Sequence, residues 1–128
     1  MVGLPGRGKS FVARSILRHL DWMGLKSRIF STKDRRRKEI AKDRTQRPRT
    51  VNVTGGEGEK IRERLAAEVL AEALEALQSD IDIAIYDASN INSERRRVLN
   101  NTVAASGLHA KVVFIESICN DEELVQRN

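Results

Sequence analysis

Residues 3–10 read Gly-Leu-Pro-Gly-Arg-Gly-Lys-Ser and match the pattern G-x-x-x-x-G-K-[ST] at every fixed position. The glycines allow such a loop to curl until its backbone N–H groups converge on phosphate oxygens. Apolar side chains at helical spacing follow from Lys9 to Met23, and a helix that begins at Lys9 directs its positive N-terminal end at the same phosphates. The stretch therefore predicts a nucleotide-binding loop, in which Lys9 reaches the β- and γ-phosphates and the Ser10 hydroxyl binds Mg²⁺.

The rest of the chain alternates short apolar runs with amphipathic stretches. Such alternation is typical of βαβ units, so we expect an α/β fold, a P-loop NTPase-type parallel sheet with flanking helices. Gly24 is expected to end the first helix, and Thr54 and Glu57 have the spacing of a capping box. We expect strands at 25–31, 81–86 and 110–116, helices at 9–23, 61–77 and 94–106, polar helical turns at 35–42 behind Asp34 as N-cap, a loop at 43–58 and a last helix from Asp121.

Only Met1 and Val2 precede Gly3, whereas a phosphate-binding loop of this kind follows a strand. The last expected helix also runs to the final residue, Asn128. We therefore interpret residues 1–128 as a single P-loop domain, of which the first strand and the C-terminal part lie outside the sequence.

The composition excludes several classes of protein. Apolar residues make up 40% and charged residues 32% of the 128 residues, an ordinary balance for one folded domain. One cysteine and two histidines exclude an intrachain disulfide and a zinc site built from cysteines and histidines. No run approaches the roughly 20 apolar residues that span a bilayer. Because no secretory leader is visible either, we expect a cytoplasmic protein without a membrane partner.

The net charge of +5 is unevenly distributed along the chain. Between Lys26 and Arg49 there are 11 basic and 3 acidic residues, which indicates an anionic partner at one place. No aromatic residue lies between Lys33 and Arg49, so this block lacks a platform for stacked bases. We therefore expect no nucleic acid as partner, and a nucleic-acid-binding module stays an alternative from another functional class.

A carboxylate for the metal is expected at the end of a neighbouring strand. The apolar run that begins at Ile81 stops at Asp87, and a polar loop follows at 88–92. Asp87 is thus the candidate that holds Mg²⁺ directly or through water, or that orients an acceptor hydroxyl. A simple capping role for Asp87 is the alternative interpretation.

Four stretches occur in an order that resembles a known family. They are residues 2–10 (VGLPGRGKS), 86–90 (YDASN), 93–96 (SERR) and 114–121 (FIESICND). Together they resemble the kinase domain of 6-phosphofructo-2-kinase/fructose-2,6-bisphosphatase over nearly the whole chain. The resemblance implies transfer of the ATP γ-phosphate to the 2-hydroxyl of fructose 6-phosphate, which gives fructose 2,6-bisphosphate.

By position, the resemblance also implies roles for individual residues. The catalytic set is Lys9, Asp87 and Cys119, although Cys119 can equally be a small packing residue, and the metal set is Ser10 and Asp87. The residues implied for the sugar phosphate are Arg36, Arg62, Ser89 and Arg95, since arginine forks suit a phosphomonoester. The residues implied for ATP are Gly3, Leu4, Pro5, Gly6, Arg7, Gly8, Lys9, Ser10, Phe11 and Asn128.

The chain also departs from the family pattern in the expected substrate region. Lys33-Asp34-Arg35 stands where the family typically has glycine, an acid or amide, and tyrosine, and no aromatic pair precedes Pro48. Two further interpretations therefore stay open: another P-loop small-molecule kinase, and a non-catalytic ATP-binding relative that acts as a scaffold. A homodimer of the full-length protein is also left open.

Overall fold

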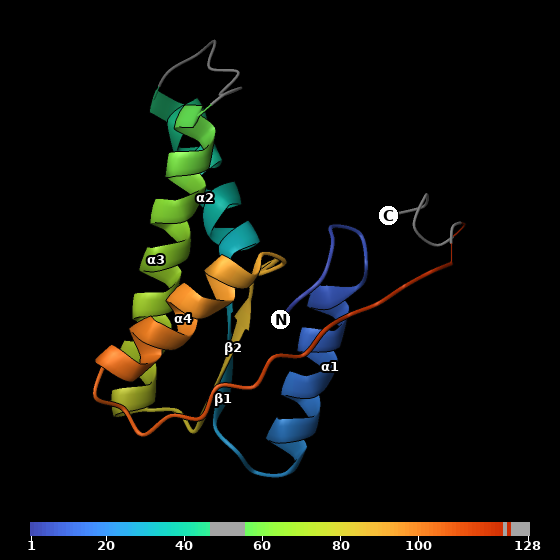
Figure 1. Ribbon diagram of the computed structural model, residues 1–128, viewed down its shortest axis with the longest axis vertical. Coiled ribbons are helices and arrows are strands. Elements are labelled where there is room, and N and C mark those ends of the chain that lie inside the picture. The colour runs from blue at the N-terminus through green and yellow to red at the C-terminus, as the bar shows by residue number, and fades with distance from the viewer. Residues whose placement is uncertain (47–55, 122, 124–128) are drawn as a thin grey trace.

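The computed structural model describes residues 1–46, 56–121 and 123, and it has an α/β architecture with a parallel sheet (Figure 1). Strands β1 and β2 pair in parallel, with Ser27 beside Ile83 and Ser31 beside Asp87. The chain passes from one strand to the other through two helices, which confirms the predicted parallel arrangement. The elements are α1 (Lys9–Trp22), β1 (Ser27–Ser31), α2 (Thr32–Gln46), α3 (Gly56–Ser79), β2 (Ile83–Asp87) and α4 (Ser93–Ala105).

Alternate residues of the two strands face opposite layers of helices. Phe30, Ala84 and Tyr86 pack in the cluster that contains Val69 and Ala73 of α3. The neighbouring strand positions face α1 instead: Ile29, Ile83 and Ile85 pack in the cluster of Ala13, Val12, Ile16, Leu17 and Leu20. Because side chains alternate between the faces of a strand, each strand contributes to two apolar layers. The sheet is therefore sandwiched between α1 and α3 (Figure 1).

The first helix ends as its sequence predicts. The Gly24 backbone, with φ of 80°, donates to the Asp21 carbonyl (3.0 Å), and the Leu25 N–H donates to the Leu20 carbonyl (3.0 Å). This pair of bonds is a Schellman motif, which satisfies carbonyls that have no partner within the helix. Glycine suits the position because a left-handed backbone strains most other residues.

The segment 110–116 is not the strand that its apolar pattern predicts. Within the described residues it makes an isolated bridge, between Val2 and Glu116. The Val2 N–H donates to the Ile115 carbonyl (2.8 Å), and the Ser117 N–H donates to the Val2 carbonyl (2.9 Å). A strand needs several consecutive partners on its neighbour, and here Val2 alone supplies them.

The expected boundaries around α2 were also wrong. The Ser31 hydroxyl, not Asp34, accepts the capping hydrogen bond, from the Asp34 N–H at 3.3 Å, so the helix begins at Thr32. It then extends to Gln46, beyond the expected polar turns and into the expected loop, whose other end lies in α3. Ion pairs join this polar helix to α3, namely Arg35 with Glu72 and Arg64 with Glu39 (3.8 Å). Thr54 lies outside the described residues.

The last predicted helix is described only at its start. The Asp121 carboxylate accepts a hydrogen bond from the Glu123 N–H at 3.0 Å, which is the geometry of a helix cap. The remaining residues of that helix are outside the described ranges. Across the parts of the chain that are described, no helix has both the length and the apolar character to cross a bilayer.

Removing the Leu65 side chain tests how far the fold depends on the buried face of α3. Leu65 is 2% exposed, whereas Ile61, one turn earlier on the same helix, is 37% exposed. We expect Leu65→Ala to lower the free energy of unfolding by about 2–5 kcal/mol, because it leaves a cavity in the core. The control Ile61→Ala should cost about 1 kcal/mol or less. Urea denaturation of the intact protein measures both, and equal losses would contradict the packing described above.

Candidate active site

Several elements begin or end at one edge of the sheet. Both strands end there, with Ser31 and Asp87 side by side in the register. The loop of residues 3–8, here called the glycine-rich loop, precedes α1 at the same edge, and α2 and α4 begin there (Figure 1). Ligands of open α/β sheets bind beyond the carboxyl ends of the strands, so this edge is the candidate site.

Hydrogen bonds from two other segments hold the glycine-rich loop. The Gly3 N–H donates to the Ser89 carbonyl at 3.1 Å, and the Asn90 side-chain amide donates to the Met1 carbonyl at 3.1 Å. On the other side, the Ser117 hydroxyl donates to the Arg7 carbonyl, and the Arg7 guanidinium donates to the Cys119 carbonyl. The loop is thereby clamped between the segment after β2 and residues 117–119.

The glycine-rich loop leads directly into α1, and no side chain caps the start of this helix. Gly8 is the N-cap residue, and its carbonyl accepts hydrogen bonds from the N–H groups of Phe11 (2.9 Å) and Val12 (3.0 Å). The first N–H groups of a helix have no partner within the helix, and no side chain caps these. Together with the helix dipole they make the start of α1 a binding site for anions.

Ser10 and Asp87 are joined directly across the edge. The Ser10 hydroxyl donates to an Asp87 carboxylate oxygen at 2.6 Å, and Asp87 is 6% exposed. Hydroxyl and carboxylate oxygens are ligands that suit Mg²⁺, which takes one or two carboxylates and completes its shell with phosphate oxygens and water. The pair therefore fits such an ion, although the described residues contain no cluster of three or more histidines, cysteines and carboxylates.

The Lys9 ammonium belongs to the same cluster. It donates to the Leu4 carbonyl at 2.6 Å, so it lies over the glycine-rich loop. Burial lowers the pKa of Lys9, the charge of Asp87 opposes that shift, and the charge of Lys33 adds to it. An ammonium, a hydroxyl and a carboxylate thus meet where a phosphate chain on the loop would end.

The arginines predicted for a sugar phosphate are only partly brought together. Arg62 lies on α3, and its Nε donates to the Gly58 carbonyl at 3.1 Å. The Tyr86 hydroxyl donates to the Ala66 carbonyl at 3.0 Å, one turn along α3 from Arg62. Burial raises the pKa of Tyr86 to about 12, and the nearby charge of Arg95 opposes this. Arg95 therefore lies near Tyr86, whereas the guanidinium of Arg62 is turned along α3 to Gly58.

The other predicted residues are placed as follows. Arg36 is exposed in the second turn of α2 and makes no contact with the other predicted sugar-phosphate residues in the described ranges. Ser89 is half-buried and contributes its carbonyl to Gly3, and Cys119 contributes its carbonyl to Arg7 rather than its thiol. Phe11 is exposed at the start of α1. Asn128 lies outside the described residues.

Sequence reasoning missed three supporting residues. The Thr32 hydroxyl donates to the Asp87 carbonyl at 3.4 Å. Asn90 is buried with φ of 41°, a conformation that asparagine tolerates, and the Arg96 guanidinium donates to its carbonyl at 2.9 Å. Its place in the polar loop at 88–92, which follows an expected strand, was a signal that could have found Asn90. Nothing in the local pattern points Thr32 at Asp87, because the contact joins residues 55 positions apart.

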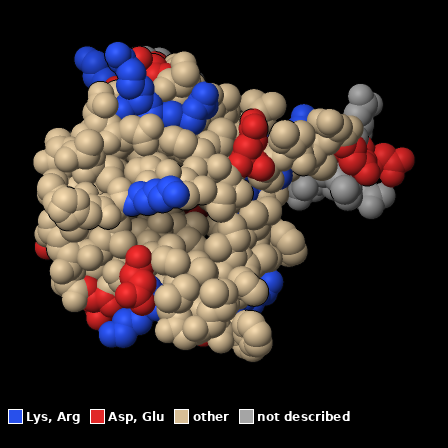
Figure 2. All heavy atoms as spheres, turned by 60° about the horizontal axis from the view of Figure 1, so that its bottom comes forward, with Lys and Arg blue, Asp and Glu red and all other residues tan. Residues whose placement is uncertain are grey.

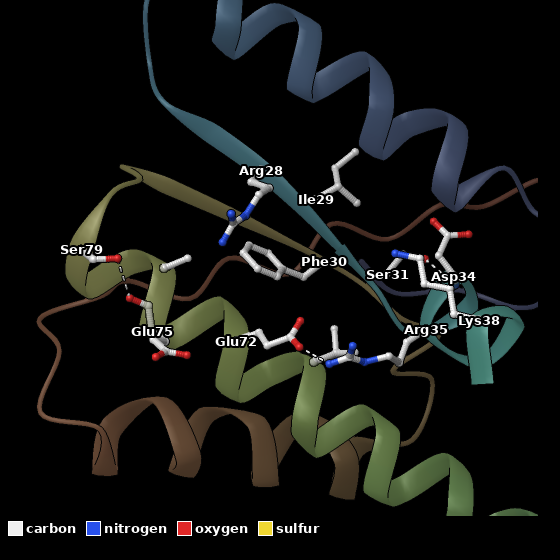
Figure 3. Close-up of a pocket in the computed structure, with 12 residues that line it drawn as sticks. Arg28, Ile29, Phe30, Ser31, Asp34, Arg35, Lys38, Glu72, Glu75 and Ser79 are labelled. Carbon is white, nitrogen blue, oxygen red and sulfur yellow. Dashed lines mark hydrogen bonds and ion pairs between the residues drawn. The ribbon is translucent and has the colours of Figure 1, made fainter. Parts of the chain in front are cut away.

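Other surfaces of the molecule differ from this edge. Figure 2 brings the opposite end of the sheet forward, and on that face basic and acidic side chains form small separate groups. A groove of about 550 Å³ lies between β1, α2 and α3 (Figure 3). Arg28, Phe30, Arg35 and Glu72 are among its lining residues. Ile29 also contributes to the lining, although its side chain points toward α1. None of the predicted ATP or sugar-phosphate residues lines the groove.

Comparison with known proteins gives a consistent match along the chain. The family model described as 6-phosphofructo-2-kinase matches residues 1–128. A Rattus norvegicus protein named 6-phosphofructo-2-kinase/fructose-2,6-bisphosphatase 1 is 33% identical over 129 residues, which are all of this chain and 26% of the rat protein.

Two proteins of Saccharomyces cerevisiae also match the whole chain. The one named 6-phosphofructo-2-kinase 1 is 33% identical, and this chain covers 16% of it. The one named fructose-2,6-bisphosphatase is 30% identical, and this chain covers 28% of it. The chain thus spans less than a third of the length of these relatives.

A methyl group at Gly3 tests the clamp on the glycine-rich loop. Gly3 has φ of 138°, and a Cβ there would lie 2.7 Å from the Ser117 carbonyl oxygen. Gly24 also has a positive φ, of 80°, but a Cβ there would meet no atom within 4 Å, so it is the matched control. We expect Gly24→Ala to cost about 1–2 kcal/mol of unfolding free energy from backbone strain alone. Gly3→Ala should cost about 1–3 kcal/mol more from the clash. Chemical denaturation measures both losses, and equal values would argue against the clamp.

Proposed function

The chain belongs to the 6-phosphofructo-2-kinase family, and we propose that the protein that carries it transfers the γ-phosphate of ATP to the 2-hydroxyl of fructose 6-phosphate. The product of that reaction is fructose 2,6-bisphosphate. The observation that carries this proposal is the contact of Ser10 with Asp87, beside Lys9 and behind the glycine-rich loop. We further propose that residues 1–128 are part of a cytoplasmic kinase domain of the P-loop type.

The glycine-rich loop and the start of α1 would hold the phosphates of ATP. The stretch from Gly3 to Phe11 would surround the phosphates with backbone N–H groups and the positive end of a helix, which together favour a polyanion, although Pro5 has no N–H and those of Gly3 and Phe11 bond protein carbonyls. The Lys9 ammonium would exchange the Leu4 carbonyl for the β- and γ-phosphates, because a charged phosphate oxygen accepts a stronger hydrogen bond than a neutral carbonyl. Asn128 would supply a further ATP contact.

Ser10 and Asp87 would hold Mg²⁺, Asp87 directly or through water. The bound ion supplies charge neutralisation at the β- and γ-phosphates. The Ser10 hydroxyl would then turn its lone pairs to the metal and give up the hydrogen bond to Asp87. Asp87 is buried at the end of β2 and is held in place by its strand, so it offers a fixed carboxylate to the metal or to the acceptor hydroxyl.

The arginines would anchor the 6-phosphate of the sugar. A phosphomonoester carries nearly two negative charges and three acceptor oxygens, which suit several guanidinium groups. Arg95 lies near Tyr86, Arg62 lies on α3, which the Tyr86 hydroxyl contacts at Ala66, and Arg36 and Ser89 are at the same edge of the sheet. Anchored in this way, the sugar would present its 2-hydroxyl to the γ-phosphorus for in-line transfer, in which catalysis is positioning and charge stabilisation. A thiol nucleophile is not required, so Cys119 would act through its backbone carbonyl.

A second candidate is a nucleotide-binding relative without kinase activity. It is favoured by the match to a protein named for the bisphosphatase alone. The residues at 33–35 also depart from the family pattern in the substrate region. Incubation of the intact protein with labelled ATP and a panel of acceptors separates the candidates. Transfer to fructose 6-phosphate supports the kinase, transfer to another acceptor supports a different small-molecule kinase, and ATP binding without transfer supports the second candidate.

Removal of the Lys9 ammonium tests the phosphate-binding part of the proposal. We expect Lys9→Ala to reduce kcat by at least about 10²–10³-fold, because a positioned cation at the transferred phosphate is lost. Lys60→Ala, which removes an exposed lysine from α3, is the control and should retain the normal rate. The readout is transfer of labelled phosphate to fructose 6-phosphate. A normal rate for Lys9→Ala would contradict the assignment of the loop.

Removal of the Arg62 guanidinium tests the sugar-phosphate part. We expect Arg62→Ala to raise the KM for fructose 6-phosphate by about 10- to 100-fold, because a charge-assisted hydrogen bond contributes about 1.5–3 kcal/mol. The KM for ATP should change little. The matched control is Arg64→Ala on the same helix, which loses only exposed ion pairs with Glu39 (3.8 Å) and Glu68 (3.5 Å). An unchanged KM in Arg62→Ala would remove this residue from the site.

A further inference from the structure

Lys33 is placed at the candidate site by the junction of β1 and α2. Ser31, the last residue of β1, lies beside Asp87 in the strand register, and the Thr32 hydroxyl donates to the Asp87 carbonyl at 3.4 Å. Lys33 is the next residue, in the first turn of α2. Lys33 therefore directly follows Thr32, which contacts Asp87, and Asp87 is the residue that accepts the hydrogen bond from Ser10.

The charge of Lys33 reaches the same place as the charge of Lys9. Lys9 lies over the glycine-rich loop, and the Lys33 ammonium contributes to lowering the pKa of Lys9. The strand register and the bond of Thr32 to Asp87 place the start of α2 at the edge where Lys9 lies. Helices α1 and α2 thus each carry a lysine in the first turn at one end of the sheet.

The position of Lys33 would favour a bound anion. Lysine in the first turn of a helix faces the positive end of the helix dipole, where cations are disfavoured. Within residues 1–46 and 56–121 no ion pair joins Lys33 to a carboxylate, since Asp34 pairs with Arg37 (3.8 Å) and Asp87 is bonded to Ser10. A chain of phosphates would neutralise both ammonium groups and both helix ends together.

Lys33 is also a departure from the family pattern, which typically has glycine at this position. A glycine there brings no charge, so the contribution of Lys33 cannot be inferred from the resemblance. It depends on where this chain places the residue.

We propose that Lys33 is a second phosphate-binding residue, which contacts the terminal phosphate of the bound nucleoside triphosphate from the α2 side while Lys9 contacts it from the loop side. The proposal rests on the proposed function, because it requires the phosphates to lie on the glycine-rich loop. Lys33 acts by binding, and no bond to it forms or breaks.

The test compares nucleotides with and without the terminal phosphate. Calorimetry on the intact protein with Mg²⁺ measures the affinities for ADP and for a nonhydrolysable ATP analogue. We expect Lys33→Gln to weaken the binding of the ATP analogue by about 3- to 10-fold. This loss lies between the contribution of an exposed ion pair and that of a charge-assisted hydrogen bond. The affinity for ADP should change by less than about twofold, and Lys33→Arg should retain the affinity for the analogue. Lys38→Gln, which removes the same charge from an exposed site further along α2, should leave both affinities unchanged.

The outcomes separate this proposal from the one on which it rests. If the unmodified protein binds neither nucleotide, the proposed function fails. If it binds the analogue and Lys33→Gln binds it equally well, the proposed function stands and the role of Lys33 is overturned. The role of Lys33 is also overturned if Lys33→Gln loses affinity for ADP and for the analogue equally, or if Lys38→Gln loses as much affinity as Lys33→Gln. The effect would then be one of overall charge. A thermal melt of each variant shows that it is folded.

Discussion

The hydrogen bond from the Ser10 hydroxyl to the Asp87 carboxylate, at 2.6 Å, organises this protein. It joins the first turn of α1 to the last residue of β2 across 77 positions of the chain. Asp87 is also fixed by the register of β2 against β1 and by the Thr32 hydroxyl at its carbonyl. A buried carboxylate needs such partners, because desolvation without hydrogen bonds is costly. The same partners place it where a metal and phosphates would be held.

The parallel sheet concentrates positive charge at one edge. Helices α1 and α2 both begin beside the carboxyl ends of the strands, so their positive ends lie at the same side of the molecule (Figure 1). Lys9 and Lys33 each add a positive charge, and burial lowers the pKa of Lys9. Such an arrangement opposes the stability of the ligand-free chain, and a bound polyanion would reverse that effect. Functional sites commonly concentrate unfavourable interactions in this way.

Secondary structure was predicted correctly where it depends on a local residue pattern, and incorrectly where it depends on contacts with a distant segment. The period of α1 and of α3, and the apolar runs of β1 and β2, identified these elements because their buried faces recur along the chain. The segment 110–116 has the residues of a strand, but its pairing depends on Val2. The missing partners on Val2 thus overrode the local preference of that segment. The polar helix α2 has little apolar pattern to mark its ends, and it extends beyond the predicted turns to Gln46.

The sequence alone determined the glycine-rich loop, the helix behind it and the carboxylate after a strand, because each is encoded by neighbouring residues with specific chemistry. Only the tertiary structure decided that Ser10 touches Asp87, that residues 117–119 clamp the loop, that Tyr86 bonds the Ala66 carbonyl of α3 and that Thr32 bonds the Asp87 carbonyl. These contacts join segments far apart in the chain. They follow from strand register and helix packing, which the order of residues within one segment does not specify.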